Sequence, residues 1–180
     1  MNKVLYVACS PFSGSTLLSL VLNTHSEIFT VGHMTGWAYP EGEEFYCSCG
    51  EELNDCGFWI YVAAAMRDRG FPFELRDFGT EYRLATNDRL NRYLTSQARL
   101  LPGRRLEAVR DFLVKLNPAW ATTLHRQDEA NSAFIGAVLS FSGTRVFVDN
   151  SHDPYRLQHL RIRISRQRSD SLHAESDDGR

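Results

Sequence analysis

The sequence predicts an α/β fold in which a parallel sheet is flanked by helices and carries a largely helical insertion. Two observations support the sheet. A strand-like apolar run over residues 4–8 leads through a loop into a helix, and a second run over residues 144–148 does the same. The insertion is indicated by residues 60–143, which read mainly as helices with Gly and Pro at their ends. Strands that alternate with helices are typical of parallel sheets.

The composition is that of one soluble globular domain. The chain has 180 residues, of which 43% are hydrophobic and 23% are charged. Its formal net charge of −2 gives no general attraction to nucleic acid or to anionic membranes. No apolar stretch approaches the roughly 18 residues of a membrane span, and no signal-peptide pattern is present. We therefore expect a cytoplasmic protein without a nucleic-acid partner or a membrane span.

The N-terminal strand, loop and helix form a candidate anion site. We expect the strand over residues 4–8, the loop over 10–15 and the helix over 16–22. The loop amides and the first helical turn lack internal partners, and the helix dipole adds partial positive charge, so a phosphate or sulfate group suits this place. Gly14 permits close approach of the backbone, and Ser13, Ser15 and Thr16 add hydroxyl donors. The alternative is a plain helix start with Ser and Thr as caps.

A histidine follows the next strand-like run, which covers residues 27–32. His33 lies just beyond this run and close to the predicted anion loop in the order of elements. An imidazole titrates near neutral pH, so a histidine here is a candidate base for removing a proton from a substrate. The alternative is a hydrogen-bonded loop histidine at the surface.

Three of the four cysteines cluster within residues 43–59. Cys47, Cys49 and Cys56 could donate three thiolates to Zn²⁺, but a closed structural zinc site needs a fourth ligand. Cys9 and His33 are the separated candidates for that ligand. A disulfide between two of the cysteines and simple packed thiols are the other interpretations. The incomplete ligand set favours a structural insert over a zinc site.

The region of residues 60–143 is predicted as a succession of helices. Apolar residues recur there at helical spacing, which favours packing roles, and Pro118 should kink or split one helix. The predicted helices cover residues 60–69, 80–101, 106–126 and 131–140, with a loop over 71–79.

A second site segment follows the strand-like run of residues 144–148. Ligands in open parallel sheets bind outside the carboxyl ends of the strands, so residues 149–152 should lie beside the loop that contains Ser13. Ser151 and His152 are the candidate site residues, and Pro154 opens a helix over residues 155–160. Capping of that helix by Ser151 or Asp153 is the alternative role.

Three motifs, in this order, resemble the bacterial-type sulfotransferases that use 3′-phosphoadenosine 5′-phosphosulfate. They are Ser-Gly-Ser-Thr at residues 13–16, Cys-x-Cys-Gly followed by Cys-x-Phe-Trp at 47–59, and Asp-Asn-Ser-His with Pro-x-Arg-x-x-x-Leu at 149–160. The resemblance implies a P-loop-like fold over residues 1–160 and transfer of a sulfuryl group to a hydroxyl or amine acceptor. It assigns donor binding to Ser13, Gly14, Ser15, Thr16 and Ser151. His33 and His152 are the implied catalytic residues. A Walker-type kinase is disfavoured, because the loop lacks both the leading Gly and the Lys of that motif.

The chain departs from the family pattern at three places. Phe12 stands where a cation is usual, and His152 stands where a Lys is usual. After Leu160 the family continues with a strand and a segment that holds the 3′-phosphate, whereas residues 161–180 read as a polar, disordered tail. We therefore expect a fold incomplete at its C-terminus, and self-association through the uncovered core surface. The function is then either that of an active sulfotransferase or that of a non-catalytic nucleotide-binding fragment. The sequence does not identify the acceptor substrate.

Overall fold

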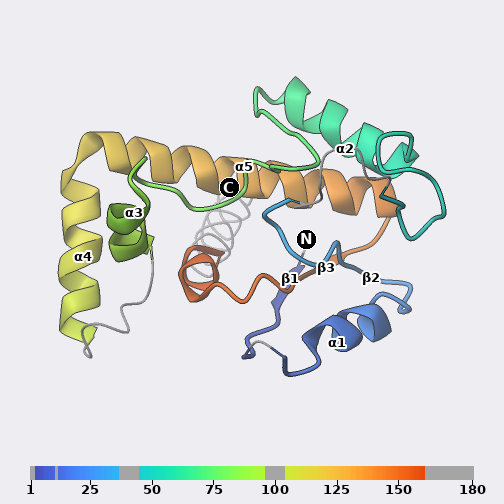
Figure 1. Ribbon diagram of the computed structural model, residues 1–180, viewed down its shortest axis with the longest axis horizontal. Coiled ribbons are helices and arrows are strands. Elements are labelled where there is room, and N and C mark those ends of the chain that lie inside the picture. The colour runs from blue at the N-terminus through green and yellow to red at the C-terminus, as the bar shows by residue number, and fades with distance from the viewer. Residues whose placement is uncertain (1–2, 11, 37–44, 96–103, 161–180) are drawn as a thin grey trace, which may run out of the picture.

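The chain forms an α/β structure in which a small parallel sheet lies between helices (Figure 1). The computed structural model describes residues 3–10, 12–36, 45–95 and 104–160. The predicted tail over residues 161–180 and all of residues 96–103 therefore lie outside the described residues. The predicted α/β class with a parallel sheet and a helical insertion is confirmed for the described part of the chain.

The sheet has three parallel strands in the order β1, β3, β2. They are β1 (Lys3–Tyr6), β2 (Ile28–Phe29) and β3 (Val146–Asp149). The central strand β3 is almost fully buried, as its run of Val, Phe and Val predicts. Its pairing with β1 sets Lys3 opposite Val146, and Val7 extends the contact by donating to the Asp149 carbonyl at 2.9 Å. This pairing brings the carboxyl ends of β1 and β3 to one edge.

The helix α5 (Pro118–Ser142) forms the spine of the molecule, with 25 residues. Figure 1 shows it spanning the width of the molecule above the sheet, while α1 (Ser15–Leu22) lies on the other side of the strands. The Asn117 side chain caps its start by accepting from Ala119 and Trp120, and Pro118 occupies its first turn. Gly143, with a left-handed φ of 69°, ends it.

Of the three further helices, two pack directly against this spine. α2 (Gly57–Asp68) lies along α5, and both helices contribute to one aromatic core. α4 (Arg104–Leu116) meets the start of α5 at Pro118, which confirms that proline as the break between two helices. α3 (Asp88–Thr95) is the shortest of the three, and residues 154–160 are also helical.

The predicted helix over residues 80–101 is wrong in its first part. Residues 80–87 are not helical, and Thr80, Tyr82 and Leu84 are buried while Glu81 and Arg83 are exposed. This alternation has the period of two that extended chain requires, so the sequence did contain the signal. The helix begins only after Asn87, whose side chain accepts from the amides of residues 89 and 90. Residues 96–101 of the prediction lie outside the described part.

Other boundaries also differ from the prediction. The expected strand over residues 27–32 shortens to two residues, because the Thr30 amide donates to the Asn23 side chain at 3.0 Å and Gly32 adopts a left-handed φ of 79°. The expected separate helix over 131–140 is part of α5. Residues 127–130, Gln-Asp-Glu-Ala, contain no helix breaker, so the helix continues through them.

A buried ion pair joins the end of the sheet to the helices. Asp149 and Arg156 are 0% and 2% exposed, and Arg156 Nε lies 2.5 Å from Asp149 Oδ2. Arg156 also donates through Nη1 to the Thr80 carbonyl at 3.0 Å, and Asn131 of α5 donates to the same carbonyl at 2.9 Å. These contacts connect β3, the extended segment after residue 79, α5 and the helical residues 154–160.

The outer face of α1 is apolar and exposed. Leu17 and Leu20 are 67% and 62% exposed, whereas the buried residues of this helix are Ser15 and Ser19. This polarity is the reverse of that expected for a surface helix covering a core. Among the described helices, none combines the length and the apolar character that crossing a bilayer requires.

We expect Arg156→Met to lower the free energy of unfolding by about 3–5 kcal/mol, because the substitution leaves the Asp149 carboxylate buried without its partner. Urea unfolding followed by circular dichroism measures the loss. Arg83→Met is the matched control, since the pair of Arg83 with Asp88 is exposed and should contribute less than about 1 kcal/mol. The double variant Asp149→Asn with Arg156→Met should be more stable than Arg156→Met alone. Equal losses at Arg156 and Arg83 would contradict this account.

Candidate functional site

The candidate site lies at the carboxyl ends of β1 and β3, where the loop after β1 leads into α1. Two residues of this loop have left-handed backbone, Phe12 at φ 64° and Gly14 at φ 82°. Gly14 stands at the N-cap of α1, and no side chain caps that helix among the described residues. The amides of the first turn are therefore free of intrahelical and side-chain partners, as an anion site requires. A Cβ at Gly14 would meet nothing within 4 Å, so the backbone conformation rather than space demands glycine here.

His152 connects the loop after β3 to the start of α1. Its Nε2 lies 3.0 Å from Ser15 Oγ, and its Nδ1 lies 3.2 Å from the Cys9 carbonyl oxygen. With the ring proton on Nδ1, His152 donates a hydrogen bond to that carbonyl and accepts a hydrogen bond from the Ser15 hydroxyl at Nε2. His152 holds a left-handed φ of 54°, which is unusual for a residue other than glycine.

His33 lies beside His152. The two ring centroids are 5.6 Å apart with the planes tilted by 53°, and His33 is exposed. The segment after His33 is held on both sides, because the Met34 amide donates to Ser151 Oγ at 3.2 Å and the Thr80 hydroxyl donates to the Met34 carbonyl. These contacts fix the position of His33 relative to the loop after β3.

The structure thus brings four predicted site residues into one patch: Ser15, His33, Ser151 and His152. Gly14 and Thr16 lie at the adjoining first turn of α1 and are exposed. Ser13 differs, because its hydroxyl donates to the Ser10 carbonyl at 2.6 Å within its own loop. The Ser151 oxygen already accepts one hydrogen bond, so its structural contact is with the segment that carries His33.

Two residues of the patch were not predicted as site residues. Cys9 Sγ lies 3.2 Å from His152 Nδ1, although sequence reasoning considered Cys9 only as a zinc ligand. The Tyr6 hydroxyl donates to the Asp153 carbonyl at 2.7 Å. Its burial and the nearby Asp149 charge raise the pKa of Tyr6 well above its usual range, so it stays a donor. Their positions at the end of β1 were the available signal, since that edge of the sheet carries the site.

The other three cysteines form a separate group. The Sγ atoms of Cys47, Cys49 and Cys56 all lie within 4.8 Å of one another, and neither Cys9 nor His33 belongs to this group. Burial alone would raise the pKa of Cys47, but hydrogen bonds from the Cys49 amide and from the neighbouring thiols outweigh it and lower that pKa. Burial raises the pKa of Cys56 to about 11, although the hydrogen bond from the Trp59 amide in the first turn of α2 acts to lower it.

The patch offers two chemical capacities. Free amides and hydroxyls at the start of α1 can hold a tetrahedral anion, and two neighbouring imidazoles can accept or donate protons. Comparison with protein-family models, with curated proteins and with solved structures finds no match to this chain.

Proposed function

We propose that this chain binds 3′-phosphoadenosine 5′-phosphosulfate at the start of α1 and transfers its sulfuryl group to a hydroxyl or amine acceptor. The observation that carries the proposal is the contact between Ser15, at an uncapped helix N-terminus, and His152, with His33 beside it. Anion binding and proton transfer are thereby available within one patch. The all-parallel sheet with β1 leading into α1 supports a P-loop-like arrangement.

Donor binding rests on the first turn of α1. The phosphosulfate carries negative charge, which the helix dipole and the open amides stabilise. The hydroxyls of Ser15 and Thr16 supply further donors at the same end of the helix. His152 orients the Ser15 hydroxyl through their 3.0 Å contact. His152 therefore contributes to nucleotide binding indirectly, by positioning the Ser15 hydroxyl that contacts the phosphosulfate.

The reaction is an in-line displacement at sulfur. The acceptor oxygen or nitrogen forms the new bond to sulfur, and the bond from sulfur to the 5′-phosphate oxygen breaks. The electron pair of that bond leaves with adenosine 3′,5′-bisphosphate, and the proton of the acceptor passes to His33. His33 is exposed, so its ring can reach an acceptor that arrives from solvent.

A non-catalytic nucleotide-binding role is the second candidate. It is favoured by Phe12, which is fully exposed at the place where a cation would neutralise charge on the bridging oxygen. In this case the start of α1 binds the nucleotide and no transfer follows. Binding and turnover measured on the same preparation distinguish the two functions, and preference for ATP with Mg²⁺ would favour a kinase instead.

We expect the full chain to bind adenosine 3′,5′-bisphosphate near micromolar affinity, about −8 kcal/mol, in a calorimetric titration. Gly14→Ala should weaken this binding by about tenfold, because an L-residue resists the left-handed backbone by about 1–2 kcal/mol and the loop relaxes away from the anion.

Gly143→Ala is the matched control. Gly143 also has a positive φ, 69°, and an added Cβ there would meet nothing within 4 Å, but it ends α5. This control should lose stability and keep its affinity. Equal affinities of the Gly14 variant and the parent chain would refute donor binding at this loop.

We expect His33→Gln to lower the rate of sulfuryl transfer by about 10²–10⁴-fold, because the acceptor then loses its general base. The assay measures sulfate release from 3′-phosphoadenosine 5′-phosphosulfate with water as acceptor, followed by a panel of alcohols and amines. Donor affinity should stay within about threefold, since His33 acts on the acceptor. His125→Gln, at an exposed site on α5, is the control. Unchanged transfer in the His33 variant would exclude it as the base.

We also expect the chain to self-associate through the apolar face of α1, which should appear as a mass above that of the monomer in light scattering. Leu20→Glu should shift the mass toward the monomer, because it places a charge in a 62% exposed apolar face. Ile60→Glu is the control, since Ile60 is similarly exposed on α2. A monomeric parent chain, or an equal shift in both variants, would count against this face.

A further inference from the structure

Residues 45–53 form a tight hairpin that carries two cysteines on its turn. The Cys47 amide donates to the Glu51 carbonyl at 2.8 Å, and the Gly50 amide donates to the Cys47 carbonyl at 2.9 Å. Tyr46 pairs with Glu52 as an antiparallel bridge. Gly50 has a φ of 94°, which closes the turn immediately after Cys49. The hairpin therefore fixes the separation of Cys47 and Cys49 by backbone hydrogen bonds.

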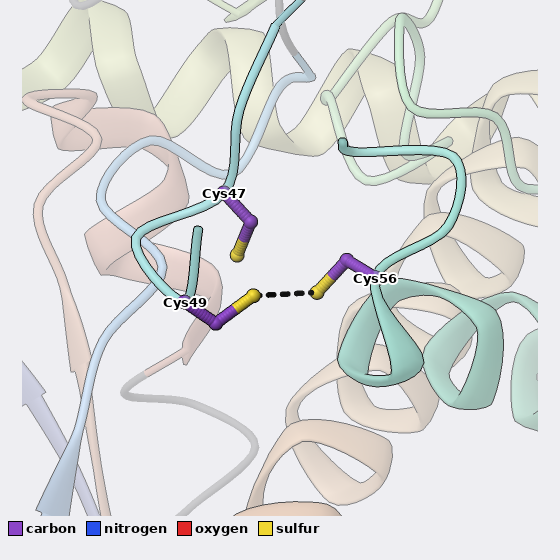
Figure 2. A group of neighbouring side chains, drawn as sticks. All are labelled: Cys47, Cys49 and Cys56. Carbon is purple, nitrogen blue, oxygen red and sulfur yellow. Dashed lines mark hydrogen bonds between the residues drawn. The ribbon is translucent and has the colours of Figure 1, made fainter. Parts of the chain in front are cut away.

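The third cysteine comes from a different element. Cys56 stands at the N-cap of α2, directly before Gly57, and is 2% exposed. Figure 2 shows the three sulfurs pointing toward one another, two from the hairpin and one from the start of the helix. Cys49 Sγ lies 3.6 Å from Cys56 Sγ, and all three sulfurs lie within 4.8 Å of one another.

We propose that Cys47, Cys49 and Cys56 bind one Zn²⁺ ion through their three thiolates, with the fourth coordination position open to water. In tetrahedral geometry with Zn–S bonds of about 2.3 Å, neighbouring sulfurs lie about 3.8 Å apart. The 3.6 Å separation of Cys49 and Cys56 is close to that edge, so the ion fits with small side-chain adjustments. Thiolate ligands select zinc and similarly thiophilic ions over magnesium and calcium.

The geometry fits zinc better than it fits a disulfide. A disulfide brings two sulfurs to about 2.05 Å and would leave the third cysteine of the group without a bond. A metal ion uses all three. Cys49 is exposed and Cys56 is buried, so solvent reaches the group from the side of Cys49 and a water molecule can supply the fourth ligand.

The site is anchored to the core. Leu53, Cys56 and Trp59 belong to the main hydrophobic cluster, and Phe45 and Cys47 pack against it. A bound ion would therefore clamp the hairpin to the start of α2, whose position the core already determines. The consequence is stabilisation of the domain by metal, because the ion binds the folded arrangement of the three thiolates.

The test uses the full reduced chain, freed of metal, and Co²⁺ as a spectroscopic probe. We expect one Co²⁺ per chain, with thiolate-to-cobalt charge-transfer absorption in the near ultraviolet that Zn²⁺ abolishes by displacement. Zn²⁺ at about 100 times its dissociation constant should raise the melting temperature by about 5–10 °C.

Cys49→Ser is the decisive variant, since Cys49 is exposed and its substitution leaves the core intact. Loss of a residue that only supports a metal ligand weakens binding by about 10–100-fold. Cys49→Ser removes a ligand itself, so it should weaken Zn²⁺ binding by more than this. Cys9→Ser, outside the group, should keep one ion per chain. The proposal is overturned if no ion binds stoichiometrically, if Cys9→Ser weakens binding as much as Cys49→Ser does, or if thiol counting on the chain before reduction finds two of the three cysteines in a disulfide.

Discussion

The buried pair of Asp149 and Arg156 is the constraint on which the rest of the structure depends. A carboxylate and a guanidinium, both almost inaccessible to water, are tolerable only because each meets the other and further hydrogen bonds. Asp149 Oδ1 also accepts from the Ser151 amide at 3.0 Å, and Arg156 donates to the Thr80 carbonyl. The need to satisfy these groups sets the course of the chain immediately after β3.

The candidate site inherits its geometry from this constraint. Asp149 holds the Ser151 amide, and the next residue, His152, has a left-handed φ of 54° with its ring nitrogens near Ser15 and Cys9. The Thr80 carbonyl accepts from Arg156, and the Thr80 hydroxyl donates to the Met34 carbonyl. The second bond holds the residue that follows His33, and so it helps to fix the position of His33. A single buried charge pair therefore governs loops from three parts of the sequence. The hydrogen bonds that pair the buried charges and those that position the residues of the patch therefore belong to one network.

A second constraint comes from aromatic packing between α2, α5 and the loop between α2 and α3. Phe78 lies 5.2 Å from the rings of Trp59, Phe73 and Phe134, and these residues occupy the main core cluster. This packing positions the start of α2 and hence Cys56. The cysteine group shares no residue with the patch near α1, so zinc binding and anion binding can be tested with separate variants.

The sequence by itself determined those features that depend on local pattern. Short-range periodicity and the restricted backbone of proline and glycine predict the strand, loop and helix at the N-terminus, the break at Pro118 and a strand over residues 144–148, which the structure has at Val146–Asp149. The rule that ligands meet the carboxyl ends of parallel strands also predicted that His152 lies beside the start of α1, where it contacts Ser15, whereas Ser151 contacts Met34 after β2. The prediction of a helix was wrong at residues 80–87, where the alternation of exposed and buried residues was overlooked. In the structure the Thr80 carbonyl accepts from Arg156 and Asn131.

Only the tertiary structure decided which side chains meet. Cys9 and Cys56 are residues of the same type, yet one contacts His152 and the other completes a group of three thiols. Spacing in the sequence grouped Cys56 with Cys47 and Cys49, but it gave no sign that Cys9 meets His152, because that contact joins residues 143 positions apart. The physical reason is that long-range partners are selected by burial and by satisfaction of buried polar groups, which are properties of the folded chain as a whole.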